Sequence, residues 1–323
     1  MRSRRKSAAI FFLAAIFLLL ITAIFLVWKG RLWREAGRFT FVLNGDPLTV
    51  VSLEPNTHRA AVLTIPANTF LEVPFGYGDY KASSIFRLGK LENKHRSGFL
   101  LTRSVENSLG IMIDGYVSPK EGMSKFSINS SEDIKNIKKN YFSYTSLPGV
   151  ILKFLKEGSQ YETNLTLADL YRIWQEIKNL RSDKIKLINM SESTALTDNK
   201  LADQTTVKII DNDIFDFVIG NDFEDIIIRF ENVSLEVVNA TDVDKLATQV
   251  GRVLKNLGAN VIAKTTSEQT EKFSCLVKVF NKRNGILIKR LVNHYQCKME
   301  DGTNMKEASS VDIKLLLGEG FIK

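Results

Sequence analysis

The feature that most constrains this chain is an uncharged run of 21 residues near its N-terminus. Residues 8–28 read AAIFFLAAIFLLLITAIFLVW and contain no acidic or basic side chain. As an α-helix rising 1.5 Å per residue, this run spans about 30 Å, the thickness of the hydrocarbon core of a bilayer. A surface helix of a soluble protein has one apolar face and not an apolar surface all round. Residues 8–28 are therefore predicted to form a transmembrane helix that tethers the rest of the chain.

A cleaved signal peptide is the alternative for such a run. The apolar region of a signal peptide has about 7–15 residues and ends at a small-residue A-x-A site. This run is longer and ends in Val-Trp-Lys-Gly-Arg. We therefore expect an uncleaved signal-anchor, with a basic tail at 1–7, the span at 8–28 and a stalk at 29–38.

The orientation of the span does not follow from the flanking charges, because basic residues lie on both sides of it. The tail before the span is only seven residues long, and no other segment is hydrophobic enough to cross a membrane. We therefore expect a single-pass protein of the cell membrane with a cytoplasmic N-terminus and with residues 39–323 outside the cytoplasm.

The formal charge of +8 raises the hypothesis of nucleic-acid binding, so the position of the charge matters. Residues 1–38 contain eight of the 44 Lys and Arg residues and one of the 36 Asp and Glu residues. Residues 39–323 hold 36 basic and 35 acidic residues and are almost neutral. The basic excess flanks the predicted span, where membrane lipid with anionic headgroups is the natural partner. This distribution argues against a nucleic-acid partner.

The chain has two cysteines, Cys275 and Cys297. In an oxidising extracytoplasmic space an even pair of cysteines can form a disulfide, and two small buried apolar side chains are the alternative. The spacing alone does not decide between them. A zinc site is not expected, because four ligands are needed and the three histidines are scattered at positions 58, 95 and 294.

Residues 39–230 are predicted to form one mixed α/β unit, which is long enough to bury a core. The alternating runs at 38–43, 48–53 and 59–65 indicate strands, with the last two forming a β-hairpin. Helical spacing is found at 80–91 and 98–109, with Gly110 as a stop signal, and at 131–141, 149–156 and 214–219. Thr166 and Asp169 form a capping signature before the stripe of Ile173, Trp174 and Ile177. Further strands are predicted at 70–73, 111–117, 185–190, 206–210 and 226–230.

Residues 234–323 are predicted to form a second, smaller α/β module. Strands are expected at 235–239, 259–263, 273–280 and 311–317, and helices at 246–257 and around 285–293. Thr241 is the expected N-cap of the first helix, and Gly258 its stop signal. The expected fold class is therefore α/β, with an N-terminal transmembrane helix, a mixed-sheet domain at 39–230 and a C-terminal module at 234–323.

Two runs of the C-terminal module resemble the C-terminal domain of LytR-type cell-envelope proteins. They are LEVVNATDVDKLATQVGRVLKNLGANVI at 235–262 and SVDIKLLLGEGF at 310–321. That domain opens with a strand that ends in an Asn-Gly/Ala-Thr turn, followed by a helix, and closes with an Asp-containing strand that runs into Leu-Gly. The Asn239-Ala240-Thr241 turn and residues 312–318 match this plan.

Upstream, two further runs resemble the LytR-CpsA-Psr domain. They are LTVVSLEPNTHRAAVLTIPANTF at 48–70 and SVENSLGIMIDGYV at 104–117. The resemblance implies a cell-wall protein of bacteria. Active members of the family use arginines to hold a polyprenyl-pyrophosphate-linked glycan, and acidic residues with a divalent cation assist its transfer to peptidoglycan. Asp46 stands where the first acidic residue of the family precedes its strand.

The chain departs from this family where the chemistry is carried out. The Arg-Asp of the central motif is Ala67-Asn68 here, and the later Arg-x-Arg and Arg-Gln pairs have no counterpart between 149 and 181. A pyrophosphate needs planar guanidinium donors, so the loss of the set removes the evident stabilisation of charge. Asp46 remains a weak catalytic candidate, with turn capping as its alternative role. Arg59, Arg87 and Arg103 are weak candidates for ligand binding, with solvated surface charges as the alternative.

Two hypotheses follow. In the first, the protein is a non-catalytic envelope scaffold, or a binder of cell-wall polymer or lipid-linked glycan, with no cofactor; its C-terminal module contacts wall polymer or other envelope proteins. In the second, it is a Mg²⁺-dependent phosphotransferase that moves a polyprenyl-pyrophosphate-linked glycopolymer onto peptidoglycan with a relocated set of arginines. Convergence of basic side chains with Asp46 on one concave surface would favour the second. The sequence favours the first.

Overall fold

The computed structural model describes residues 17, 22, 28–92, 97–120, 128, 130–146, 148–149, 158–201, 204–281, 285–302 and 310–322. The predicted tail and nearly all of the predicted span lie outside these residues, as does most of the helix expected at 149–156. Within the described part of the chain, no helix is both long and apolar enough to cross a membrane.

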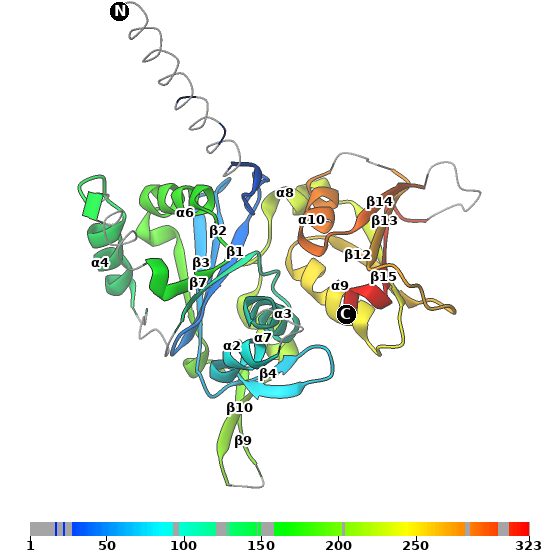
Figure 1. Cartoon of the computed structure of the whole chain (residues 1–323), viewed down its shortest axis with the longest axis horizontal. Helices are drawn as coiled ribbons and strands as arrows, with labels where there is room; N and C mark the ends of the chain where they lie inside the picture. Colours follow the sequence, from blue (N-terminus) through cyan, green and yellow to red (C-terminus); the bar gives the residue numbers. More distant parts are fainter. Residues whose placement is uncertain are drawn as a thin grey trace, which may run out of the picture.

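A six-stranded mixed sheet lies at the centre of the N-terminal half, in the order β7-β6-β1-β2-β3-β8 (Figure 1). The predicted β2–β3 hairpin is confirmed, with antiparallel pairing from Leu48 opposite Ile65 to Glu54 opposite Arg59. β6 and β8 join β1 and β3 in parallel, so the sheet is mixed. Its strands are β1 (Phe39–Leu43), β2 (Leu48–Glu54), β3 (Arg59–Ile65), β6 (Gly115–Pro119), β7 (Tyr161–Thr163) and β8 (Ile185–Asn189).

Helices cover both faces of this sheet (Figure 1). α2 (Ala82–Leu91), α3 (Ser97–Leu109) and α7 (Asn212–Ile219) lie on one face, and α4 (Ser131–Tyr141) and α6 (Leu167–Asn179) on the other. Neighbouring side chains point to opposite faces of a strand, so Val42 and Val50 pack toward α2 and α3, whereas Phe41 and Val51 pack toward α6. Two small hairpins, β4 (Phe70–Val73) with β5 (Gly78–Lys81) and β9 (Leu196–Lys200) with β10 (Thr206–Ile210), extend this half.

The ends of the helices follow the signals in the sequence. The hydroxyl of Thr166 accepts a hydrogen bond from the backbone N–H of Asp169, whose carboxylate in turn accepts from the backbone of Thr166, so the predicted capping signature of α6 is confirmed. Ser130 and Asp133 form the same box at the start of α4. Gly110, with φ of +63°, follows the last residue of α3, as expected of a residue in the left-handed region.

The C-terminal half contains a separate five-stranded sheet in the order β12-β11-β15-β13-β14. Its strands are β11 (Ser234–Ala240), β12 (Asn260–Thr266), β13 (Cys275–Val279), β14 (Lys298–Asp301) and β15 (Ile313–Gly318), and its helices are α9 (Leu246–Asn256) and α10 (Ile286–Tyr295). Alternate residues of β11, β13 and β15 are buried beneath α9 and α10 (Figure 1). The expected α/β arrangement is therefore present, whereas the resemblance of this half to the LytR C-terminal domain stays a prediction.

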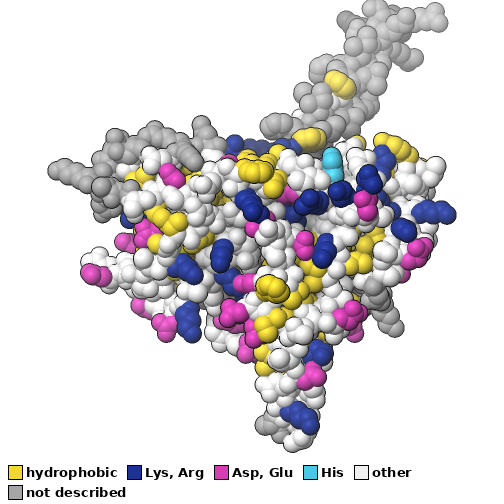
Figure 2. All heavy atoms as spheres, turned by 180° about the vertical axis from the view of Figure 1, so that it is seen from behind, with side chains coloured by type: hydrophobic (Ala, Val, Ile, Leu, Met, Phe, Trp, Pro, Cys, Tyr) yellow, Lys and Arg dark blue, Asp and Glu magenta, His cyan; other side chains and the backbone are white. Residues whose placement is uncertain are grey.

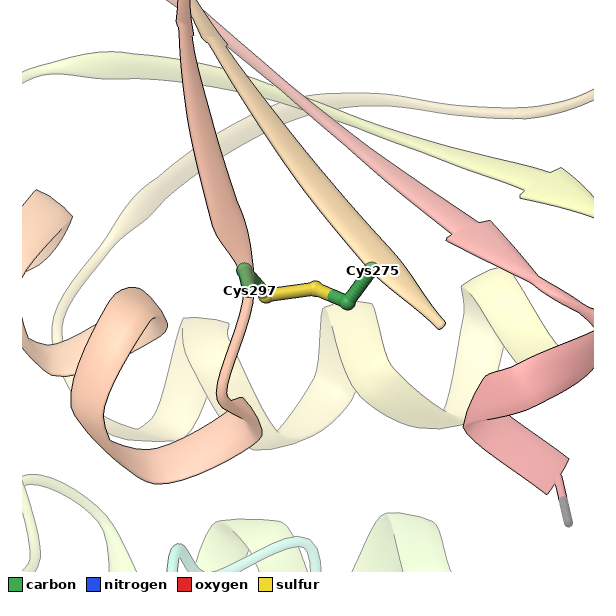
Figure 3. Close-up of a disulfide and its surroundings, with 2 residues drawn as sticks. All are labelled: Cys275 and Cys297. Carbon is green, nitrogen blue, oxygen red and sulfur yellow. A yellow bond between two sulfur atoms is a disulfide. The ribbon is translucent and has the colours of Figure 1, made fainter. Parts of the chain in front are cut away.

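A disulfide joins Cys275 to Cys297 (Figure 3). Cys275 opens β13, and Cys297 directly precedes the adjacent parallel strand β14, which places the two Cα atoms 4.5 Å apart. The bond closes a loop with a sequence separation of 22 residues, and this loop contains α10.

Two predictions from the sequence are wrong, and the strand expected at 111–117 begins only at Gly115, as β6. Residues 226–230, expected to be a strand, belong to α8 (Ile226–Glu231), because the Asp225 carboxylate accepts hydrogen bonds from the N–H groups of Ile227 and Ile228 and so starts a helix. Thr241 is not the N-cap of α9. Its hydroxyl instead bonds the Asn239 side chain at 2.7 Å within a tight turn, and α9 begins at Leu246.

The short strands β5, β7, β9 and β14 were not predicted, because most of their side chains are polar and at least partly exposed, with no clear apolar alternation. Four short 3₁₀ helices complete the described elements: η1 (Gly158–Gln160), η2 (Ser182–Lys184), η3 (Met190–Glu192) and η4 (Glu319–Ile322).

Candidate functional site

An apolar cavity of about 230 Å³ lies between the central sheet and helices α4 and α6. We call it the apolar cavity. The sheet contributes alternate residues of β1, β2 and β3, and α6 contributes the stripe of Ile173 and Ile177 that the sequence indicated. Its lining residues are Phe41, Leu43, Val51, Leu53, Ala60, Val62, Ile128, Ile134, Ile137, Lys138, Phe142, Ile173, Ile177, Leu180 and Ile185. All of these side chains except Lys138 are hydrocarbon, so the cavity suits an apolar ligand.

A few polar groups lie beside the apolar cavity. The ammonium group of Lys138 donates a hydrogen bond to the backbone carbonyl of Leu180, and partial burial lowers the pKa of Lys138. Lys178, the neighbour of cavity-lining Ile177, has its ammonium 3.3 Å from the centroid of the Tyr144 ring. The Trp174 indole donates to the carbonyl of Tyr141 at 3.0 Å and so joins α6 to the end of α4. These contacts fix the helices that form the outer wall of the cavity.

The candidate residues from the sequence lie at separate places. Asp46 is exposed in the turn between β1 and β2, and it lines neither the apolar cavity nor any of the three cavities that Arg59 and Arg103 line. Arg59 is exposed at the start of β3, beside a cavity of about 170 Å³ that Lys184 and Lys186 also line. Arg87 is exposed on α2 and lines none of these cavities. The structure therefore does not gather these four residues at one site.

Arg103 is the candidate with the most contacts. Its guanidinium is 2.8 Å from the Glu106 carboxylate and lies over the rings of Phe99, Tyr295 and Phe321 at 5.5, 4.9 and 5.5 Å from their centroids. Since Tyr295 and Phe321 come from the C-terminal half, Arg103 forms part of the interface between the two halves. Its charge is already paired.

This interface encloses a second cavity, of about 420 Å³, which we call the charged cavity. Buried side chains of α3 and α10 meet in it. His294 Nε2 lies 2.7 Å from Glu106 Oε2, and His294 Nδ1 lies 3.7 Å from Asp114 Oδ1. Arg290, one turn before His294 on α10, donates to both oxygens of Asp114 at 2.8 and 3.2 Å. These four side chains join the N-terminal half to the C-terminal half.

The pKa values of this cluster are set by competition between burial and pairing. Burial alone would raise the pKa of Glu106, but the charges of His294 and Arg103 outweigh it and hold that pKa at about 2. Burial would also raise the pKa of Asp114, and Arg290 together with His294 lowers it. Burial lowers the pKa of His294, and the neighbouring Glu106 reverses the direction, so the net pKa is raised. The cluster is therefore a compensated set of charges.

The sequence did not reveal this cluster, because Glu106 and His294 are 188 residues apart. The only local signal is the spacing of four residues between Arg290 and His294, which places both on one face of α10. Among the described residues, no group of three His, Cys, Asp or Glu side chains is placed to hold a metal ion.

No protein-family model matches the chain, and a comparison with the curated proteins found no match. Among solved structures, the crystal structure of B. subtilis TagV is 18% identical, with 57% of this chain and 95% of TagV covered and a TM-score of 0.41. TagT bound to LIIa-WTA is 17% identical, with 58% and 91% covered and a TM-score of 0.39. The LytR-CPS2A-psr family protein YwtF (TagT), with bound octaprenyl pyrophosphate lipid, is 17% identical, with 58% and 90% covered and a TM-score of 0.37.

The name of the YwtF structure gives the same family as the one that the runs at 48–70 and 104–117 resemble. At 17–18% identity this likeness says nothing about activity.

Proposed function

We propose that this protein is a membrane-anchored extracytoplasmic protein of the bacterial cell envelope that binds the prenyl chain of a lipid-linked glycan without transferring the glycan. The apolar cavity carries the proposal. A cavity with hydrocarbon walls stays free of water and gains free energy when an apolar ligand fills it. Burial of each CH₂ group contributes about 0.8 kcal/mol, so each buried isoprene unit adds several kcal/mol against the entropy cost of ordering the chain.

The absence of transfer chemistry rests on the position of the charged residues. Transfer of a glycan from a pyrophosphate needs cationic donors aimed at the phosphate oxygens as charge develops. Ala67 and Asn68 stand at the positions of the Arg-Asp motif, and Arg103 is committed to Glu106 at the interface. Asp46 lines none of the three cavities that Arg59 and Arg103 line. The ligand is therefore held by its lipid chain.

The remaining parts of the proposal come from the sequence. The span at 8–28 anchors the protein with its tail at 1–7 in the cytoplasm, and this arrangement brings the apolar cavity to the side of the membrane where envelope polymers are assembled. The C-terminal half packs against the N-terminal half through α10. It contacts wall polymer or an envelope protein.

The test compares two probes on the full chain in detergent: a polyprenyl alcohol and the corresponding polyprenyl pyrophosphate, each with and without Mg²⁺. We expect both probes to bind with affinities within about tenfold of each other, because the chain and not the phosphate carries the binding. Ile177→Trp, which fills the apolar cavity, should weaken both by at least about tenfold. Leu91→Trp, at an exposed position on α2, is the matched control and should bind like the wild type.

A different result would overturn the proposal. If only the pyrophosphate binds, and if that binding needs Mg²⁺ and is lost in Asp46→Ala, the phosphotransferase hypothesis replaces it. If neither probe binds although Ile177→Trp and the wild type show the same folded circular-dichroism spectrum, the apolar cavity is not a lipid site.

A further inference from the structure

We propose that a groove between the stalk and α10 binds the phosphate headgroup of an anionic phospholipid, so that a membrane lipid holds both halves of the protein. The groove has a volume of about 410 Å³. Arg31, Leu32 and Arg34 form its stalk side, and Val292, Asn293 and Gln296 of the α10 region form the opposite side. We call it the headgroup groove. The inference rests on the predicted span of the proposed function but is independent of the apolar cavity.

The position of the groove along the chain matches the headgroup layer. The predicted span ends at Trp28, and a bilayer adds roughly 5–8 Å of headgroup region on each side of its hydrocarbon core. Arg34 turns back toward the span, because its guanidinium donates to the carbonyls of Arg31 at 3.1 Å and Lys29 at 3.5 Å. The Arg31 guanidinium lies 4.6 Å from the centroid of the Trp28 ring, and Trp is enriched at membrane interfaces. Both guanidinium groups therefore lie within a few residues of the membrane boundary.

The charge of the groove suits a phosphodiester. Among the residues that the structure describes, neither Arg31 nor Arg34 has an ion-pair partner, and both are at least partly exposed. The nearest acid in sequence, Glu35, accepts a hydrogen bond from the Asn293 side chain of α10. Guanidinium groups bind phosphate oxygens through paired hydrogen bonds, and the amide of Gln296 offers a further donor. On the face shown in Figure 2, several Lys and Arg side chains form a band in the upper part of the molecule.

The stalk is attached to α6 through its backbone and the Trp33 ring, which positions the segment that carries the two arginines. The Asp169 carboxylate accepts hydrogen bonds from the backbone N–H groups of Leu32 and Trp33 at 3.1 and 2.9 Å. The Trp33 side chain is 1% exposed, and the Arg172 guanidinium stacks on it at 4.1 Å and donates to its carbonyl at 2.9 Å. A site whose donors are ordered before binding loses less entropy when the ligand arrives. In Figure 1 this segment, in dark blue, lies close to α6 and α8.

The test measures lipid selectivity of the full chain in neutral detergent. Phosphatidylglycerol and phosphatidylcholine, each with brominated chains, are added in trace amounts, and the quenching of Trp28 is read as the difference between the wild type and Trp28→Phe. We expect phosphatidylglycerol to quench preferentially. Arg31→Gln with Arg34→Gln should reduce this preference by about fivefold for each arginine, the effect of one basic residue at an anionic surface. Glu35→Gln should increase the preference, because it removes the negative charge next to Arg34 in the chain and keeps an acceptor for the Asn293 side chain that lines the groove.

The controls separate the alternatives. Lys255→Gln with Lys272→Gln removes the same charge from exposed positions that do not line the groove, and should leave the preference unchanged. An equal loss in this control would show a general charge effect and overturn the site. Competition by inorganic phosphate at the concentration of the lipid would assign the groove to a free phosphate, and equal quenching by both lipids would exclude an anionic headgroup. Polyprenyl binding in the apolar cavity is measured separately, so failure of one proposal is distinguishable from failure of the other.

Discussion

The apolar cavity and the charged cavity differ in whether the side chains that line them already have interaction partners within the protein. The charged cavity is the larger, at about 420 against 230 Å³, and it contains the groups with perturbed pKa values that usually mark a functional site. The two carboxylates among those groups are nevertheless paired: Glu106 with His294 and Arg103, and Asp114 with Arg290. The lining of the apolar cavity contains no charged pair, and apart from Lys138 it offers a ligand only hydrocarbon.

Perturbed pKa values alone therefore do not distinguish a ligand-binding site from a structural contact between the two halves of the protein. In the charged cavity, the charges compensate one another across the two halves, so their main effect is to hold α10 against α3. The apolar side chains that face the apolar cavity have no protein group to pack against there, so an apolar ligand would complete their packing.

Breaking the Arg290–Asp114 pair should have the largest effect on stability. Arg290→Met leaves the Asp114 carboxylate buried without its partner, which typically costs about 3–5 kcal/mol. Denaturant unfolding of the full chain measures the free energy of unfolding. The control is Arg181→Met, which removes an exposed pair with Asp183 and should cost about 1 kcal/mol or less. If Arg290→Met lowers the free energy of unfolding as little as the control does, the buried charges do not hold the two halves together.

Enlarging the apolar cavity should cost somewhat less. Ile173 is 6% exposed and packs from α6 against the central sheet. Ile173→Ala should destabilise the protein by about 2–4 kcal/mol, because it removes buried methyl groups and leaves a larger void. The same substitution should weaken binding of short prenyl chains relative to longer ones, since a larger cavity is left partly empty. Calorimetric unfolding and a chain-length series of polyprenyl alcohols measure the two effects. If chains of all lengths are weakened equally, Ile173 does not line the bound-chain site.

The pH dependence of stability should come from the charged cavity. The pKa of His294 is raised above its ordinary 6.5. The stabilisation that protonated His294 gives the folded protein is therefore fully present below pH 6.5 and is lost as pH rises through the folded-state pKa. The pKa of Glu106 is lowered from 4.5 to about 2. The stabilisation that ionised Glu106 gives the folded protein is therefore fully present above pH 4.5 and is lost as pH falls toward 2. Unfolding free energies measured from acid to alkaline pH should therefore decline at both ends.

The control for this dependence is His294→Gln, which keeps a hydrogen-bonding side chain but does not titrate. Its unfolding free energy should fall less on the alkaline side than that of the wild type. Identical alkaline slopes for the two proteins would show that His294 does not carry the effect.

The smallest effect is expected from the cap of α4, the helix that forms the outer wall of the apolar cavity. Ser130→Ala removes the side-chain acceptor for the Asp133 N–H and should cost about 1 kcal/mol. Ser130→Asp, which keeps a capping acceptor, should recover most of the loss. Equal unfolding free energies for the alanine variant and the wild type would mean that α4 is held by its packing on the sheet alone.

Local signals in the sequence determined much of the secondary structure. The β2–β3 hairpin, the capping box at Thr166 and Asp169 and the stop at Gly110 are set by residues close together in the chain, so their pattern suffices. The apolar stripe of α6 indicated one wall of the apolar cavity for the same reason. The failure at 226–230 shows the limit of such patterns: a run of Ile residues favours a strand, but the Asp225 cap and the contact of Glu231 with the start of α10 make it a helix.

Only the tertiary structure decided the contacts between residues that are distant in sequence. It paired Glu106 with His294 across 188 residues, joined Cys275 to Cys297, and placed Arg103 at an interface and away from Asp46. It also packed the stalk between α6 and α10. Sequence spacing carries no record of such pairs, because they form only once segments that are distant in the chain pack against each other. The physical reason is that helices and turns depend on neighbours in the chain, whereas cavities and buried charges depend on neighbours in space.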